Sequence, residues 1–296
     1  MSKELDPTQR MRLSLDGLSV GDALGERFFG PPADAARRIE ARALPTGPWR
    51  YTDDTEMAIS IVEVLVKRGE LDPDMLADRF AQRFNPTRGY GGGAQKLLRS
   101  FQNKIPWQVA ASELFGGSGS YGNGSAMRVA PLGAFLADDL SEVVDQAARS
   151  AVVTHAHPEG VAGAVAVAVA AAAAYRQSAA GTLDGAALFE MVLDKTPDSE
   201  TRQRTLEASG LHAATPAHEA ARRLGSGQNV SCPDTVPFVI WCAAHNLADY
   251  VAAFWHTVSG LGDRDTTCAM VGGIVALSSR SVPADWMALR EPLPNL

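Results

Sequence analysis

Cysteine is scarce in this chain, and so are the patterns that predict β-strands. The three cysteines among its 296 residues, Cys232, Cys242 and Cys268, form neither a Cys-x-x-Cys pair nor an even set. A disulfide framework is therefore not expected, and we predict reduced thiols in a cytoplasmic protein. Alternating apolar and polar runs bounded by turn residues are nearly absent, which argues against a β-sheet.

An excess of positive charge is also lacking. The formal net charge of −7 argues against a protein that binds duplex nucleic acid, because such a protein needs a basic face to displace counterions. A locally positive pocket for a phosphorylated ligand is still compatible with this charge. Residues 1–16 are polar and mixed in charge, without the apolar core of a signal peptide.

Long apolar runs are missing, although one segment comes close. Residues 160–175 read GVAGAVAVAVAAAAAY, which is shorter than the roughly 20 residues that a bilayer requires. Alanine and glycine dominate this segment, and small residues let a helix pack closely on its neighbours. We therefore predict a buried helix here and no association with a membrane.

Helical signals, in contrast, are abundant. Apolar residues make up 46% of the chain, which is enough for a sizeable core. The segment after Asp54 is apolar on more than one side, Pro73 opens another helix with Asp72 as its cap, and residues 14–25 indicate a closely packed helix of small residues. Further helices are predicted at 93–102, 106–115, 124–137, 141–153, 158–176, 183–195, 198–209, 215–224, 234–245, 247–258 and 266–279. No linker divides the chain, so we predict an all-α fold in a single domain, 1–296.

An acidic segment stands directly before the helix that follows Asp54. It contains Thr52, Asp53 and Asp54, and its simplest interpretation is a helix N-cap. A cap needs only one acceptor, however, and this segment offers several. Adjacent carboxylates repel each other, and the cost is acceptable when a cation lies between them.

A second segment has the same composition and also precedes an apolar helix. It contains Asp263, Asp265 and Thr266, again two carboxylates with a neighbouring hydroxyl. The two segments together offer only oxygen ligands, with no cysteine or histidine among them. This donor set favours Mg²⁺ or Mn²⁺ over Zn²⁺, so the sequence predicts a cation site built from both segments.

Two glycine-rich loops are candidates for binding a phosphorylated ligand. Residues 116–125 read GGSGSYGNGS, and residues 88–93 read RGYGGG. Both could be flexible surface loops, but glycines that lead into a helix let backbone N–H groups approach a phosphate closely. Of the six histidines only His155 and His157 cluster. Two such residues without a third ligand are poor evidence for zinc, so we expect one of them to line a polar pocket.

Together these segments resemble the ADP-ribosylglycohydrolase family. The likeness rests, in order along the chain, on Gly-Asp-Ala-Leu-Gly at 21–25, Thr-Asp-Asp-Thr at 52–55, Ser-Tyr-Gly-Asn-Gly-Ser-Ala-Met-Arg at 120–128, Thr-His at 154–155 and Asp-Arg-Asp-Thr-Thr at 263–267. These segments span nearly the whole chain. The stretch at 120–124 and the loop at 88–91 look closest to the serine-ADP-ribose hydrolase branch.

The resemblance implies a compact all-α fold with two Mg²⁺ ions, or Mn²⁺ in some members, at the base of a cleft. By position, the metal ligands would be Thr52, Asp53, Asp54, Asp263, Asp265 and Thr266, with Asp265 bridging. The residues that would hold the pyrophosphate and distal ribose are Gly91, Gly93, Ser120, Tyr121, Gly122, Asn123 and Gly124, and His155 would contact the phosphates. The resemblance further implies hydrolysis at C1″ of the distal ribose, which releases ADP-ribose from a modified protein or a related conjugate. We expect Asp53 or Asp54 to be the base.

Two positions depart from the pattern of the family. Many members have a glutamate eight residues after the first glycine of the 21–25 motif, and this chain has Phe29 there. Either the nearby Glu26 replaces that glutamate from a reshaped loop, or catalysis relies on the aspartates alone. Arg264 stands where the family commonly has threonine, and we expect its side chain to point outward, toward a ligand phosphate.

Two other functions remain compatible with the residues. The substitution at Phe29 allows a catalytically silent module that only binds ADP-ribose, although a degenerate enzyme usually loses some metal ligands. A dimetal phosphoesterase that cuts the pyrophosphate is disfavoured by the scarcity of metal-ligating histidine. The sequence leaves open which linkage is cut: to arginine, to serine, to a nucleic-acid end or in O-acetyl-ADP-ribose.

Overall fold

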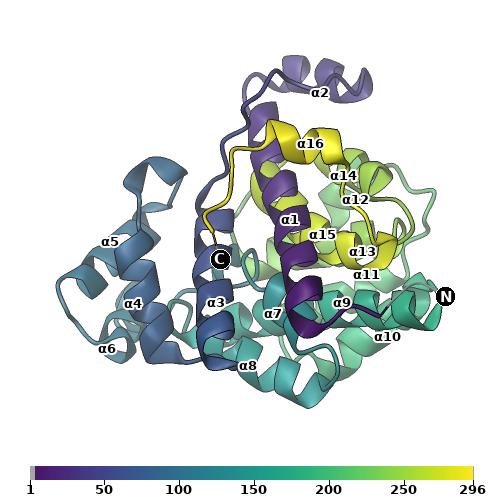
Figure 1. The fold of residues 1–296 in the computed structure, drawn as a ribbon. Coiled ribbons are helices and arrows are strands. Elements are labelled where there is room, and N and C mark those ends of the chain that lie inside the picture. Colours follow the sequence, from purple (N-terminus) through teal and green to yellow (C-terminus); the bar gives the residue numbers. More distant parts are fainter. Residues whose placement is uncertain (1–3, 296) are drawn as a thin grey trace.

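Helices build the fold throughout the part of the chain that the structure describes (Figure 1). In this computed structural model, residues 4–295 form sixteen α-helices, short 3₁₀ helices and no β-strand, so the all-α prediction is confirmed. Two isolated β-bridges, between Trp49 and Arg290 and between Gly122 and Ser231, join loops. Residues 1–3 and 296 of the expected domain lie outside the described residues.

The α-helices follow one another along the whole chain. Their bounds are α1 (Pro7–Gly25), α2 (Pro32–Glu40), α3 (Asp53–Arg68), α4 (Pro73–Arg83), α5 (Gly92–Gln102), α6 (Trp107–Ser112), α7 (Ala130–Phe135), α8 (Leu140–Val152), α9 (Pro158–Ala180), α10 (Gly185–Lys195), α11 (Glu200–Ser209), α12 (Ala217–Leu224), α13 (Cys232–Ala244), α14 (Tyr250–Val258), α15 (Arg264–Ser279) and α16 (Ala284–Leu289). The 3₁₀ helices are η1 (Glu26–Phe28), η2 (Pro86–Arg88), η3 (Leu114–Gly117) and η4 (Asn123–Ser125).

Local sequence signals explain most helix ends. Thr52 caps α3 by accepting a hydrogen bond from the Asp54 N–H, and Asp72 caps α4 by accepting one from the Met75 N–H, as predicted. The helix predicted at 124–137 is wrong in its extent, since only η4 and the short α7 form there. Pro131 explains the difference, because it has no N–H to continue a helix from the preceding turn.

Close packing between α1 and α15 positions the functional part of the molecule (Figure 1). A Cβ atom at Gly17 would lie 2.3 Å from the carbonyl oxygen of Gly272, and one at Gly21 would lie 2.1 Å from that of Cys268. At Gly25 the corresponding distance, to the oxygen of Arg264, is 2.5 Å. These glycines are four residues apart and so share one face of α1, which lets the two backbones touch. The prediction of a closely packed small-residue helix is confirmed.

The apolar segment at 160–175 lies within α9 and is buried. Among the described residues this is the one helix long and apolar enough to cross a membrane, but 83% of its most apolar window is buried inside the protein. Helices α7, α8, α10 and α15 pack against it. We therefore assign α9 to the core, where alanine and glycine allow its neighbours to approach closely.

Candidate functional site

Three helix ends bring the acidic segments together. Asp22 lies near the end of α1, Asp54 in the first turn of α3 and Asp265 in the first turn of α15. One carboxylate oxygen from each of these residues lies within 4.8 Å of the other two. The contact between α1 and α15 produces this cluster, since it holds the end of one helix beside the start of the other.

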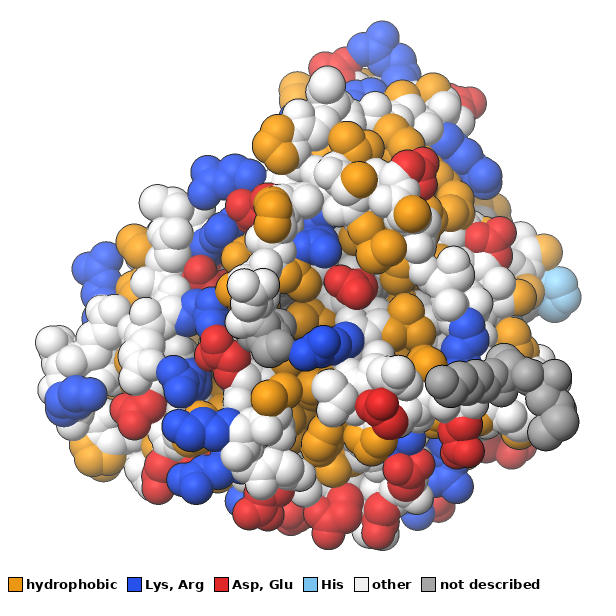
Figure 2. Space-filling model, in the orientation of Figure 1, with side chains coloured by type: hydrophobic (Ala, Val, Ile, Leu, Met, Phe, Trp, Pro, Cys, Tyr) orange, Lys and Arg blue, Asp and Glu red, His pale blue; other side chains and the backbone are white. Residues whose placement is uncertain are grey.

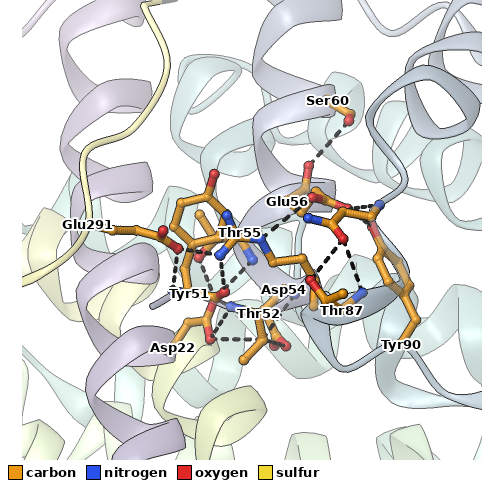
Figure 3. A network of polar contacts seen from close by, with 12 residues as sticks. Asp22, Tyr51, Thr52, Asp54, Thr55, Glu56, Ser60, Thr87, Tyr90 and Glu291 are labelled. Carbon is orange, nitrogen blue, oxygen red and sulfur yellow. Dashed lines mark hydrogen bonds and ion pairs between the residues drawn. The ribbon is translucent and has the colours of Figure 1, made fainter. Parts of the chain in front are cut away.

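Asp22 holds the start of α3 in place (Figure 3). Its Oδ2 accepts hydrogen bonds from the N–H groups of Thr52 (2.9 Å) and Thr55 (3.1 Å) and from the Thr55 hydroxyl (2.5 Å). The Thr52 hydroxyl lies 2.8 Å from Asp22 Oδ1 and 2.9 Å from Asp54 Oδ2. These contacts use most of the acceptor capacity of Asp22, so we assign it to positioning Thr52 and Asp54.

The other two carboxylates of the cluster have spare acceptor capacity. Asp54 Oδ1 and Asp265 Oδ1 are buried and have no hydrogen-bond partner among the described residues. A buried charged group without a partner destabilises the protein, unless a bound cation pairs with it. The neighbouring donors are carboxylate and hydroxyl oxygens, which are the ligands that Mg²⁺ and Mn²⁺ prefer. The residues present therefore fit a divalent cation.

The electrostatics of the cluster point in the same direction. Burial raises the pKa of Asp54 well above its usual range, and the charges of Asp22 and Asp53 raise it further. Burial also raises the pKa of Asp265, and the charge of Asp54 adds to this effect. Carboxylates that are hard to ionise together become easy to ionise around a bound cation, because its charge offsets their repulsion.

A cavity of about 470 Å³ opens directly above this cluster. Four of the predicted metal-site residues line it: Asp53, Asp263, Asp265 and Thr266. The other two, Thr52 and Asp54, are buried beneath them. All of the predicted ligand-binding residues line the same cavity: Gly91, Gly93, Ser120, Tyr121, Gly122, Asn123, Gly124 and His155. Asn123 donates a hydrogen bond from its side-chain amide to Asp263 Oδ2 (2.8 Å), which links the glycine-rich loop to the acidic segment.

Of the helix N-termini that line this cavity, that of α5 has no acidic residue in its first turn, in contrast to those of α3 and α15. Gly91 is the N-cap and offers no side-chain capping bond, and Gly91, Gly93 and Ala94 line the cavity. The first N–H groups of an α-helix lack intrahelical partners and carry partial positive charge, which favours an anion. The sequence had suggested the start of a long helix near Ser125 for this role, but the three-residue η4 lies there instead.

His155 is held against the glycine-rich loop. A Cβ atom at Gly124 would lie 2.9 Å from Cε1 of the imidazole, and one at Gly122 would lie 3.3 Å from its Nε2. The other ring nitrogen, Nδ1, lies 2.7 Å from the Thr154 hydroxyl. Burial lowers the pKa of His155 to about 3, and the charge of Arg128 contributes. The imidazole is therefore neutral near pH 7. His157 has a structural part, since its side chain accepts a hydrogen bond at the start of α9.

The residues that depart from the family pattern do not line this cavity. Glu26 is exposed in η1 and does not line the cavity. Phe29 is also exposed, and the Arg264 guanidinium lies over its ring, 4.9 Å from the centroid. Arg264 does not line the cavity of the glycine-rich loops, so its side chain points away from the place expected for a phosphate.

Several residues of the site were missed at the sequence level. Asp22 was recognised only as part of a motif, although a carboxylate in a helix of small residues is a signal in itself. Phe115 and Val230 line the cavity, and both are exposed with positive φ angles of 53° and 51°. Asn229 lies beside Val230 on the same wall. No local pattern marked these three, because only the fold brings them to the cavity.

The fold and the site define a class of protein: an all-α molecule with a buried carboxylate cluster beneath a glycine-lined cavity. The sequence model of the ADP-ribosylglycohydrolase family matches residues 3–294, and the chain belongs to that family. It is 27% identical to the ADP-ribosylhydrolase ARH3 of Danio rerio, over 95% of this chain and 86% of that protein. It is 31% identical to the ADP-ribosylhydrolase ARH3 of Homo sapiens, over 80% of this chain and 73% of that protein.

A solved structure gives the same result for the fold. The structure titled "ADP-ribosylglycohydrolase-related protein complex" superimposes with a TM-score of 0.63, covering 97% of this chain and 93% of its own, at 24% identity. The predicted family resemblance is thus confirmed by sequence and by fold. The chain is an ADP-ribosyl hydrolase.

Proposed function

We propose that this hydrolase removes ADP-ribose from a modified protein by cleaving the bond at C1″ of the distal ribose, with two divalent cations, Mg²⁺ or Mn²⁺. The observation that carries the proposal is the pair of unpartnered oxygens, Asp265 Oδ1 of a residue that lines the cavity and Asp54 Oδ1 of its buried neighbour in the cluster. When bound there, such cations would polarise the ribose hydroxyls and lower the pKa of an attacking water. The ligands would be the six oxygen-bearing residues of the two acidic segments.

The cavity has chemistry suited to the rest of ADP-ribose. The uncapped N-terminus of α5 offers backbone N–H groups to the pyrophosphate. A neutral His155 whose Nδ1 accepts from Thr154 would add an Nε2–H donor to the lining of the cavity. The rings of Phe115 and Tyr121 are exposed and line the cavity, where aromatic side chains would stack on a base.

Asp53 is the residue best placed to act as general base. It lines the cavity, whereas Asp54 is 1% exposed and lies below the cavity wall. In the proposed step a water oxygen bonds to C1″ while the bond from C1″ to the acceptor breaks. The Asp53 carboxylate takes a proton from the attacking water, and the departing acceptor atom takes up a proton from bulk water. Glu26 does not line the cavity, but it lies near the acidic residues, since burial raises its pKa and the charges of Asp22 and Asp263 raise it further.

A product assay tests the proposal. ADP-ribosylated proteins with defined linkages are incubated with the purified chain in Mg²⁺, in Mn²⁺ and in EDTA, and the products are separated. We expect free ADP-ribose and intact target protein, formed only with a divalent cation. AMP together with a phosphoribosyl group left on the target protein would indicate phosphoesterase chemistry, because cleavage of the pyrophosphate leaves the bond at C1″ intact. Binding of ADP-ribose without release from any substrate would indicate a silent binding module.

A further inference from the structure

Arg264 is a buried cation without a hydrogen-bonding partner. Its side chain is 7% exposed, and its Nε is buried with no acceptor within residues 4–295. No hydrogen bond or ion pair of the guanidinium occurs within these residues; it lies over the Phe29 ring, and Asp263 and Asp265 are its neighbours in the sequence. Buried guanidinium groups are usually paired, because an unpaired charge is costly. The Arg264 guanidinium can therefore donate hydrogen bonds to a ligand.

A second cavity, of about 440 Å³, is the place where this capacity is available. Its walls include Phe29, Pro32, Val230, Leu261, Asp263 and Arg264. Val230 and Asp263 also line the first cavity, so the two cavities meet at one end of the acidic cluster. None of the glycine-rich loop residues that line the first cavity at 89–93 or 120–124 lines the second.

This arrangement separates two parts of a substrate. The first cavity has the donors for a nucleotide, and the reacting carbon would lie near the acidic cluster. The acceptor is attached to that carbon, so it extends either past Asp263 into the second cavity or directly into solvent. Resting on the function proposed above, we propose that the second cavity binds the acceptor peptide, and that Arg264 selects acceptors with a carboxylate beside the modified residue.

The chemistry of the walls favours a peptide over a nucleic acid. One guanidinium lies among apolar surfaces from Phe29, Pro32, Val230 and Leu261, with Asp263 at the end shared with the first cavity, which suits a short peptide with one acidic side chain. A nucleic-acid strand needs several cations along its backbone. On the face shown in Figure 2, basic side chains are interspersed with acidic ones, and the formal charge of the chain is −7.

The test uses two ADP-ribosylated peptides that differ only next to the modified residue. One has glutamate on both sides, and the other has glutamine. For the wild-type enzyme with Mg²⁺ we expect kcat/KM about tenfold higher for the glutamate peptide at low ionic strength. This preference should fall in 0.5 M NaCl, because salt screens the attraction. The wild-type measurement stands even if a variant at position 264 fails to fold.

Variants then assign the preference to one residue. Arg264→Gln should reduce the ratio of the two kcat/KM values to about one, and Arg264→Lys should retain part of the preference. Arg37→Gln is the matched control, since Arg37 is exposed on α2, is paired with Asp34 and does not line this cavity. Its ratio should stay within twofold of the wild type. Titration with ADP-ribose reports whether the first cavity is intact in each variant.

The outcomes distinguish this inference from the proposed function. Equal rates on both peptides, or a preference that survives in Arg264→Gln, would overturn the acceptor assignment while leaving the hydrolase function in place. Faster turnover of an oligonucleotide ADP-ribosylated on its terminal phosphate would replace the peptide with a nucleic-acid acceptor. If the enzyme turned over none of these substrates, both the proposed function and the acceptor site would be contradicted.

Discussion

Glu291, near the C-terminus, accepts a hydrogen bond from the backbone N–H of Tyr51, directly before the first acidic segment (2.9 Å; Figure 3). Arg88 joins the two residues: it pairs with the Glu291 carboxylate, donates to the Tyr51 carbonyl oxygen (2.7 Å) and lies 3.9 Å from the centre of the Tyr51 ring. The C-terminal segment thus holds both the start of α3 and the loop that leads to α5.

We predict that Glu291→Ala weakens Mg²⁺ binding although the residue lies outside the cavity. The substitution leaves the Tyr51 N–H without its acceptor and removes one of the acceptors of Arg88, which costs about 1–3 kcal/mol. Glu291→Gln keeps an oxygen for Tyr51 and should retain most of the affinity. Glu207→Ala, at an exposed position on α11, is the control. Calorimetric Mg²⁺ titration with urea unfolding in EDTA checks this, and equal Mg²⁺ affinities in all four proteins would contradict it.

Asp265→Asn should abolish turnover and yet stabilise the protein in EDTA. Without a cation, the Asp265 carboxylate is buried beside Asp54 and Asp263, which repel it. Mg²⁺ at a hundred times its Kd should stabilise the wild type by about 2.7 kcal/mol and the variant by much less. Thermal unfolding in EDTA and in Mg²⁺ measures both effects. Asp285→Asn, at an exposed position on α16, should change neither. A variant that keeps turnover and a Mg²⁺-dependent shift would refute the cation assignment.

Gly124→Ala should weaken ADP-ribose binding at least tenfold, about 1.4 kcal/mol. The new Cβ would lie 2.9 Å from His155 Cε1, so the imidazole has to move out of the place where it would meet a phosphate. Gly210→Ala is the control, because its Cβ would meet no atom closer than 3.6 Å. Titrations with ADP-ribose and with ribose should show a larger loss for ADP-ribose. Equal affinities in variant and wild type would mean that His155 does not contact the phosphates.

The neutral state of His155 predicts a pH dependence of stability. Its pKa is about 3 in the folded chain and about 6.5 in an unfolded one. Between these two pKa values the unfolded chain binds a proton that the folded chain does not, so the free energy of unfolding decreases as the pH falls below 6.5. The loss amounts to about 2 kcal/mol at pH 5. His155→Gln lacks this titration. Urea unfolding of both proteins in EDTA at pH 7.5 and pH 5 should show a larger loss for the wild type, and parallel losses would contradict the prediction.

Asp53→Asn should lower kcat by 10² or more, whereas Glu26→Gln should lower it by less than tenfold. Asp53 lines the cavity, and Glu26 is exposed outside it. General acid–base groups are typically worth about 10²–10⁴ in rate. Single-turnover assays with saturating Mg²⁺ separate the chemical step from product release. A large loss in Glu26→Gln would mean that the segment after α1 closes over the cavity during turnover.

The sequence by itself determined the helices and the kinds of chemistry at their ends. Apolar spacing, the cap at Asp72 and the proline at the start of α4 are local signals, and each depends on residues within a turn or two. The paired aspartates and threonines likewise indicated oxygen ligands without any knowledge of the fold. The predicted extent of the helix at 124–137 was wrong, because the apolar spacing continues through Pro131 whereas the backbone helix starts anew there.

Only the tertiary structure decided which of these groups meet. Asp22 and Asp265 are neighbours because the glycines of α1 let its backbone touch α15, a contact between residues more than 200 positions apart. Tertiary contacts likewise place Arg264 over Phe29 and bring Glu291 back to Tyr51. Helical periodicity records which face of a helix is buried but not which helix covers it, so these contacts become visible only once the chain is folded.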